Sequence, residues 1–179
     1  MPNISRKGAN LPTSPIRKLA RQATLANERG VKIYYLNIGQ PDLASPNSAL
    51  QAIKSYNESV IAYGPSEGTR SFREKLVTYY KQHDINVDAE DILVTTGASE
   101  AIIMALDCIT NEGDELIIPE PFYANYGTFA AACGVNVIGI PSDFESQFAL
   151  PSIEKIEAAI TSKTRALFIC NPNNPSGYV

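Results

Sequence analysis

Short apolar runs alternate with helical patterns from residue 91 onward. The apolar runs are rich in Ile, Leu and Val, and segments with apolar residues at helical spacing fill the intervals between them. The expected strands are residues 92–95, 115–118, 135–140 and 166–169, and the expected helices are 99–109, 124–132 and 152–160. Strands that alternate with helices favour an α/β fold with a largely parallel sheet covered on both faces. The helix from Ser99 is apolar nearly all round, so we expect it to be buried against the sheet.

The first 90 residues predict helices joined by longer loops. Apolar spacing predicts a helix over residues 14–29, with Pro15 in its first turn and Gly30 as its end. Two further helices are expected over 46–55 and 69–82. Residues 32–37 form a short run that favours a β-strand, and a turn follows it.

The composition indicates a soluble globular chain. Of its 179 residues, 44% are hydrophobic and 19% are charged, which suits one sizeable core. A formal net charge of -4 leaves no basic stripe for nucleic acid. No apolar run approaches the length of a membrane span, and residues 1–7 lack the apolar core of a signal peptide. A cytoplasmic location is therefore the default expectation.

The cysteines and the single histidine argue against several kinds of site. Cys108, Cys133 and Cys170 are odd in number and lie in apolar surroundings, which favours buried, reduced thiols over disulfides or metal ligands. His83 follows a helix among polar residues, so we expect it to be solvated. Catalysis by Ser-His-Asp or Cys-His groups therefore lacks its base.

One turn has the composition of an anion site. Gly97, Ala98 and Ser99 lie between the expected strand at 92–95 and the apolar helix that follows. Amide hydrogens at a helix N-terminus bind phosphate, and small residues let a ligand approach the backbone closely. The alternative is that Ser99 simply caps the helix. The chain has neither the Gly-x-Gly-x-x-Gly pattern of dinucleotide sites nor a P-loop at this position.

Two more loops follow expected strands. Two prolines in residues 119–123 place Phe122 and Tyr123 at the same sheet edge as Gly97, where an aromatic ring could stack on a flat ligand or pack on the next helix. Residues 171–177 combine two Asn-Pro steps with a glycine after an apolar run that we expect to be a buried strand. This turn is either an ordinary polar loop or a source of ligand contacts such as the Asn174 amide. A phosphate cradle, a stacking face and an amide together fit a planar phosphorylated cofactor.

Five motifs occur in the order found in one enzyme family. The motifs are Asn-Ile-Gly-Gln-Pro-Asp at 37–42, Tyr-Gly-Pro-Ser-Glu-Gly at 63–68, Thr-Gly-Ala-Ser-Glu-Ala at 96–101, Pro-Glu-Pro-Phe-Tyr at 119–123 and Asn-Pro-Asn-Asn-Pro-Ser-Gly at 171–177. With these motifs the chain resembles the class I/II aminotransferases, enzymes of fold type I that depend on pyridoxal 5'-phosphate. The resemblance covers only about the first half of such an enzyme. It implies a truncated three-layer αβα domain with a mainly parallel sheet, in which residues 1–45 form an N-terminal arm and small-domain segment and 46–179 begin the cofactor-binding large domain.

The resemblance assigns cofactor contacts to this chain. It implies that Gly97, Ala98 and Ser99 hold the phosphate of pyridoxal 5'-phosphate, chiefly through the amides of Ala98 and Ser99. Tyr123 would stack on the pyridine ring. Asn174 would donate its side-chain amide to the phenolic oxygen and favour the anionic phenolate.

The resemblance also implies a substrate contact and a partner. Gly39 would lie against the substrate carboxylate, and Tyr63 would reach across a homodimer interface to the neighbouring subunit's cofactor phosphate. Prolines at the positions of Pro121 and Pro175 often follow cis peptide bonds in this family. Tyr35, Gln40 and Asn125 are candidates for lining the pocket, without an assignment of substrate.

The family's catalytic residues are not matched in this chain. The Schiff-base lysine, the aspartate that pairs with the pyridinium nitrogen and the arginine that grips the substrate carboxylate all follow the Asn-Pro-Ser-Gly motif in the family. None of the lysines present occupies a matching motif, so we expect no catalytic residue in these 179 residues and no activity from them alone. The apolar faces of the expected sheet would then be covered by a longer native protein.

The function implied is the transfer of an amino group between an amino acid and a 2-oxo acid in a biosynthetic process. A lyase or decarboxylase of the same fold is the nearest alternative, and a non-catalytic, regulatory domain that binds pyridoxal phosphate is another. A nicotinamide-dependent dehydrogenase is disfavoured because the glycine fingerprint is missing. No metal site is expected.

Overall fold

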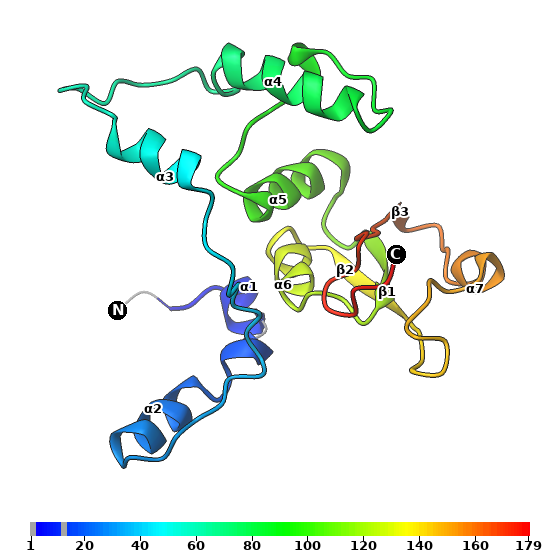
Figure 1. The fold of residues 1–179 in the computed structure, drawn as a ribbon. Helices are drawn as coiled ribbons and strands as arrows, with labels where there is room; N and C mark the ends of the chain where they lie inside the picture. Colours follow the sequence, from blue (N-terminus) through cyan, green and yellow to red (C-terminus); the bar gives the residue numbers. More distant parts are fainter. Residues whose placement is uncertain (1–2, 12–13) are drawn as a thin grey trace. The chain divides into compact units, whose positions relative to one another are not determined.

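The computed structural model describes residues 3–11 and 14–179, which divide into two compact units (Figure 1). The first unit comprises Met1–Tyr35 and Ala98–Val179, and the second comprises Leu36–Gly97. The first unit contains α1 (Arg6–Asn10), η1 (Pro15–Arg17), α2 (Ala20–Glu28), α5 (Ala98–Ile109), β1 (Glu115–Glu120), α6 (Asn125–Ala132), β2 (Asn136–Pro141), α7 (Ile153–Ala158) and β3 (Thr164–Leu167). The second contains α3 (Asn47–Lys54), α4 (Arg70–Lys81) and η2 (Ala89–Asp91).

A parallel sheet with the strand order β2-β1-β3 forms the centre of the first unit. Leu116 on β1 lies opposite Val137 on β2 and Ala166 on β3. Helix α6 connects β1 to β2 and packs beside the sheet (Figure 1). The alternation of strands and helices therefore produces the parallel α/β arrangement that the sequence predicts.

The core of this unit is centred on β1. Leu116, Ile117 and Ile118 are only 2%, 1% and 3% exposed, although successive side chains of a strand point to opposite faces. Both faces of β1 are therefore covered, as in other parallel sheets. Leu116 and Ile118 pack in one cluster with side chains from α5, from α6 and from the residue before β2, namely Leu106, Ala130 and Val135.

An ion pair joins the amino ends of β1 and β3. Arg165 Nε lies 3.0 Å from Asp114 Oδ2, and the Asn111 amide donates to the same carboxylate oxygen at 2.8 Å. The amide of Asn111 and then the guanidinium of Arg165 hold the pKa of Asp114 below its ordinary value. Because Asp114 directly precedes β1, these bonds fix where the strand begins.

Two of the expected strands are wrong. Residues 92–95 form an extended segment outside the sheet, where the Val94 amide donates to the Glu67 carbonyl oxygen at 3.0 Å. Residues 32–37 also form no strand; they end in a turn, and the Tyr35 hydroxyl accepts a hydrogen bond from Asn27 at 2.9 Å. Both runs have β-prone side chains, but no strand pairs with them in the part of the chain that the structure describes.

Burial is lower than the sequence predicts at α5 and β3. Within α5 only Leu106 is buried, whereas Met104 and Ile109 are 43% and 53% exposed, because the helix packs on α6 along a single stripe. Strand β3 has β1 as its neighbour in the described sheet, and Leu167 and Ile169 are 42% and 45% exposed. The expectations of an all-round buried helix and of a buried strand at 166–169 are therefore corrected.

The first helices, the cysteines and the histidine agree with the sequence expectations only in part. Helices α3 and α4 confirm the two expected over 46–55 and 69–82, whereas the helix expected over 14–29 is divided into η1 and α2. All three cysteines are free thiols, but Cys108 is exposed and Cys133 and Cys170 are only partly buried, so burial of these thiols is not found. His83 is exposed beside the Tyr79 ring, as expected of a solvated residue at a helix end. Among the described residues, no helix combines the length and apolar character needed to cross a membrane.

Replacing Ile117 by Ala should lower the free energy of unfolding by about 2–5 kcal/mol, because the truncated side chain leaves a cavity in a well-packed strand. Urea unfolding measures this change. The matched control is Ile153→Ala, at a position 70% exposed, which should change stability by no more than about 0.5 kcal/mol. Equal losses in the two variants would contradict the assignment of β1 as the core.

Candidate functional site

A tight turn precedes α5. Gly97 has a φ of +83°, its amide donates to the Thr95 carbonyl oxygen at 2.8 Å, and Thr95 Oγ1 donates to the Gly97 carbonyl oxygen at 3.0 Å. A Cβ at Gly97 would meet nothing within 4 Å, so the positive φ, and not crowding, favours glycine here. The turn leads directly into Ala98 and Ser99, which are both exposed.

The beginning of α5 offers donors for an anion. The helix has 12 residues, and the first amides of an α-helix have no carbonyl partner within the helix. The helix dipole adds partial positive charge at the same end. Ala98 and Ser99 therefore offer two backbone N–H groups and a hydroxyl, which is the donor set that a phosphate group needs.

The loop after β1 carries the expected aromatic residues. The Glu120–Pro121 peptide bond is cis. Phe122 packs against the core cluster, which matches the alternative that an aromatic ring here packs on the following helix. Tyr123 is partly exposed, its hydroxyl accepts a hydrogen bond from Asn125 Nδ2 at 2.8 Å, and its ring lies edge-on to Tyr126 at 5.4 Å between centroids. The Tyr123 ring is thus held in the loop by a hydrogen bond and an aromatic contact while it stays partly exposed.

The turn after β3 is tied to this loop by Asn173. Asn173 Nδ2 donates to the Pro121 carbonyl oxygen at 3.0 Å and to Ser176 Oγ at 2.7 Å. Sequence reasoning selected only the neighbouring Asn174 and did not identify this bond. Nothing in the motif distinguishes two adjacent asparagines, and only the geometry of the loop does so.

Asn174 itself is exposed, and the structure shows no hydrogen bond of its side chain within the described chain. Its amide is therefore available to a ligand. The Asn174–Pro175 peptide bond is cis, like the one before Pro121, and both agree with the expectation for these prolines. The bond between Asn171 and Pro172 is also cis, which was not anticipated.

A small, mostly apolar cavity lies behind these two loops. Its lining includes Phe122, Tyr126, Cys170, Asn173 and Tyr178. Neither Tyr123 nor Asn174 contributes to it, so this cavity is not the space that the two candidate ligand contacts face.

Tyr126 is the strongly perturbed titratable group at this sheet edge. Burial raises its pKa to about 12, and a hydrogen bond with Cys170 adds to the shift. Its ring packs against Phe168 with 4.5 Å between centroids and reaches the edge of Tyr123. Tyr126 is therefore a neutral, packed side chain, and its ring supports the position of the Tyr123 ring.

The remaining candidate residues belong to the second unit. Gly39 is exposed, with no atom within 4 Å of an added Cβ, and Tyr63 is fully exposed in the loop before α4. In the first unit, by contrast, the bond from Asn173 brings the Tyr123 and Asn174 loops together. Across residues 3–11 and 14–179, no group of three or more metal-ligating side chains is found.

Aminotransferases are among the known sequences that match this chain. The family model described as aminotransferase class I and II matches residues 31–179. Arginine–pyruvate transaminase AruH of Pseudomonas aeruginosa is 35% identical over 152 residues, which cover 84% of this chain and 38% of that protein. Aspartate aminotransferase of Pyrococcus horikoshii is 32% identical over 166 residues, covering 92% of this chain and 41% of that protein.

Solved structures show the same fold. Aspartate aminotransferase from Thermotoga maritima superposes with a TM-score of 0.87 at 25% identity, covering 96% of this chain and 46% of that one. An aminotransferase from Escherichia coli gives a TM-score of 0.87 at 29% identity, covering 98% of this chain and 44% of that one. The chain thus spans less than half the length of these relatives, and its α/β fold is that of the corresponding part of theirs.

Ionisation of Tyr126 should destabilise the folded chain at high pH. Because its pKa is raised from 10.0 to about 12, the folded state keeps this proton where the unfolded state loses it. Its contribution to stability is complete below pH 10.0 and is lost as the pH rises towards 12. A spectrophotometric titration of tyrosinate should show a last step that disappears in Tyr126→Phe. The control Tyr34→Phe, at an exposed ring, should keep that step, and its loss in both variants would refute the assignment.

Proposed function

Since the chain belongs to the aminotransferase class I and II family, we propose that it is the N-terminal part of a pyridoxal 5'-phosphate-dependent aminotransferase. The complete enzyme would transfer an amino group between an amino acid and a 2-oxo acid. The observation that carries the proposal is the hydrogen bond from Asn173 to the Pro121 carbonyl oxygen, because it holds the loops of Tyr123 and Asn174 together. The relatives reported above are named as aminotransferases or transaminases and not as lyases.

The donors present fit the cofactor. The Gly97 turn, with the amides of Ala98 and Ser99, would hold its phosphate, and the open space beside Gly97 leaves room for that group. The exposed amide of Asn174 would donate to its phenolic oxygen, and the Tyr123 ring would lie against its pyridine ring. Once bound, pyridoxal phosphate supplies an electron sink for carbanion chemistry at the substrate's α-carbon.

We also propose a division into domains, a substrate contact and a partner subunit. Residues 1–45 would belong to an N-terminal arm and small domain, and residues 46–179 to the large domain. Gly39 would lie against the substrate carboxylate. The fully exposed ring of Tyr63 supports its proposed role of reaching a second subunit in a cytoplasmic homodimer.

Pyridoxal phosphate should bind to the chain more tightly than pyridoxal, which lacks the phosphate group. Asn174→Ala should weaken the binding of pyridoxal phosphate about tenfold or more, because it removes a hydrogen bond to a charged oxygen. Absorbance titrations with the two compounds measure both effects. The matched control is Asn136→Ala on β2, whose exposed amide donates to the Gly113 carbonyl oxygen at 3.4 Å, and it should bind like the unaltered chain. Equal affinity for the two compounds would contradict the proposal.

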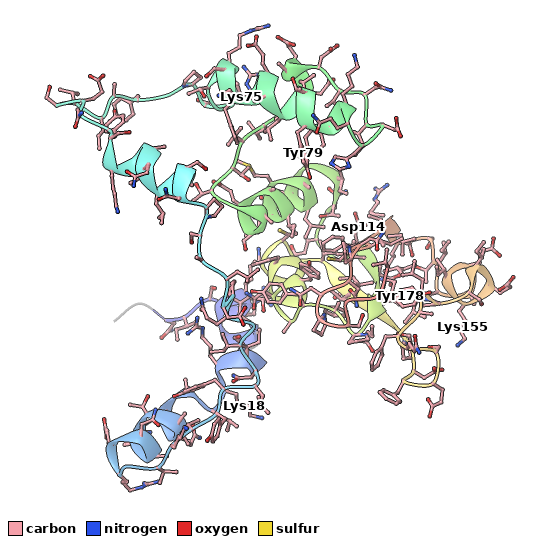
Figure 2. The ribbon with its side chains drawn as sticks, viewed as in Figure 1. Lys18, Lys75, Tyr79, Asp114, Lys155 and Tyr178 are labelled. Atoms are coloured by element: carbon pink, nitrogen blue, oxygen red, sulfur yellow. The ribbon has the colours of Figure 1, made fainter. Side chains whose placement is uncertain are left out.

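The 179 residues alone should not catalyse transamination. No lysine lies in the turn at 96–99 or in the loops at 119–123 and 171–177, so no amine is available there to bind the cofactor and move the substrate's α-proton. Lys18, Lys75 and Lys155 are exposed and belong to other parts of the chain (Figure 2). A coupled assay for the 2-oxo acid product, with pyridoxal phosphate and an amino donor, should show no turnover above the cofactor in buffer. Turnover that follows the concentration of the purified chain would overturn this prediction.

A further inference from the structure

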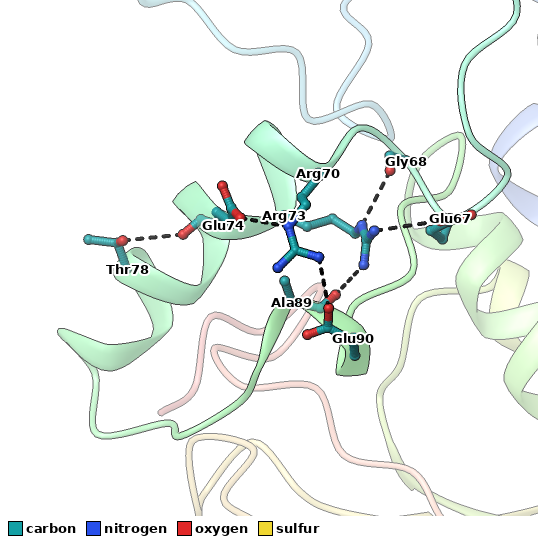
Figure 3. Close-up of polar contacts among 8 residues, drawn as sticks. All are labelled: Glu67, Gly68, Arg70, Arg73, Glu74, Thr78, Ala89 and Glu90. Carbon is teal, nitrogen blue, oxygen red and sulfur yellow. Dashed lines mark hydrogen bonds and ion pairs between the residues drawn. The ribbon is translucent and has the colours of Figure 1, made fainter.

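Arg73 is the one buried charged residue in the described part of the chain. It lies in α4, and the residue is 7% exposed. Burying a guanidinium is costly unless its N–H groups find partners. Figure 3 shows three partners: Nε donates to the Gly68 carbonyl oxygen at 3.2 Å, Nη1 donates to the Ala89 carbonyl oxygen, and Nη2 lies 3.6 Å from Glu67 Oε1.

Two of these partners belong to a loop that rests on the extended segment at 92–95. The Glu67 carbonyl oxygen accepts the Val94 amide at 3.0 Å. Gly68 has a φ of +92°, and a Cβ there would lie 2.5 Å from Val94 Cγ2. The Glu67–Gly68 backbone is therefore in direct contact with Val94, with no space for a larger residue at position 68.

The third partner, the Ala89 carbonyl oxygen, belongs to the stretch of chain that leads into residues 92–95. Ala89 begins η2, and the chain runs from there through Ile92 and Val94 to Gly97. Arg73 thus contacts the backbone at Ala89, just before residues 92–95. It also holds the Glu67–Gly68 loop, which bonds to Val94 in the middle of that segment. The bond from the Val94 amide to the Glu67 carbonyl oxygen therefore holds the middle of this segment.

We propose that Arg73 is a positioning residue for the phosphate turn at Gly97–Ser99, an inference that rests on the proposed function. Arg73 acts through Gly68 and Val94 and has no contact with the turn itself. Its planar fork of five N–H donors can bond acceptors in several directions at once, whereas a lysine ammonium cannot span the same set. The phosphate donors are backbone amides, so their placement depends on how the preceding backbone is held.

Arg70 provides a matched control on the same helix. Its side chain is 65% exposed and forms ion pairs with Glu74 at 2.8 Å and Glu90 at 3.0 Å (Figure 3). These bonds are with surface side chains, and none involves the Glu67–Gly68 backbone. Exposed ion pairs of this kind contribute little to stability.

The test compares Arg73→Lys and Gly68→Ala with Arg70→Lys in the 179-residue chain, after circular dichroism has shown that each variant is folded. Hydrogen exchange of the Val94 amide reports the contact with Glu67 without any ligand. Titrations with pyridoxal phosphate and pyridoxal report the phosphate turn. We expect Arg73→Lys to speed exchange at Val94 about tenfold and to weaken pyridoxal phosphate binding about tenfold, with pyridoxal binding unchanged.

Gly68→Ala should have the same two effects without any change of charge, because the added Cβ displaces Val94. Arg70→Lys should match the unaltered chain in every measurement. Unchanged exchange at Val94, or an unchanged preference for pyridoxal phosphate over pyridoxal in Arg73→Lys, would overturn the inference. A loss of affinity for both compounds to the same degree would also overturn it, since it would indicate general loosening. If the unaltered chain shows no preference for pyridoxal phosphate, the proposed function itself fails and the inference with it.

Discussion

Parallel pairing of β1 with both of its neighbours is the constraint on which the candidate site depends. Leu116, Ile117 and Ile118 are buried on both faces, so β1 can lie only at the centre of the sheet. Because all three strands run in the same direction, the loops after β1 and β3 emerge at one edge, where ligands bind in open α/β sheets. The hydrogen bond from Asn173 to the Pro121 carbonyl oxygen then converts two neighbouring loops into one connected structure.

The second unit is stabilised by polar contacts of a buried arginine and not by a hydrophobic core. Its one buried apolar residue among those described is Ala89, and its buried charge is Arg73. Arg73 donates to the Gly68 carbonyl oxygen in a loop and to the Ala89 carbonyl oxygen in a 3-10 helix, and these polar contacts take the place of a hydrophobic core. An arrangement of this kind fixes direction more strictly than apolar packing does, because each donor must meet an acceptor along a defined line.

Periodicity in the sequence predicted which segments form elements, but not how much of each is covered. The strands β1, β2 and β3 and the helices α5, α6 and α7 all overlap their expected ranges, and α6 and α7 lie within theirs. The errors at residues 92–95, along α5 and at Cys108 share one cause. A β-prone or apolar run shows that a segment can pair or be buried, whereas the outcome depends on whether another segment lies against it. Asn173 was missed for a related reason, since its identity equals that of Asn174 and only its position in the folded loop separates their roles.

The amount of information that the family motifs carry about the site depends on the chemistry of their donors. Ala98 and Ser99 would act through backbone N–H groups, which every residue except proline possesses, so the side chains of the turn carry little information about the site. The order of five motifs along the chain was informative because each one places backbone at a particular sheet edge or loop. For the same reason, residues that hold the backbone from a distance affect such a site more than their separation from the ligand suggests. In this chain the contacts run from Arg73 through Gly68 to Val94. A motif search confined to residues that touch the cofactor would not select these three residues.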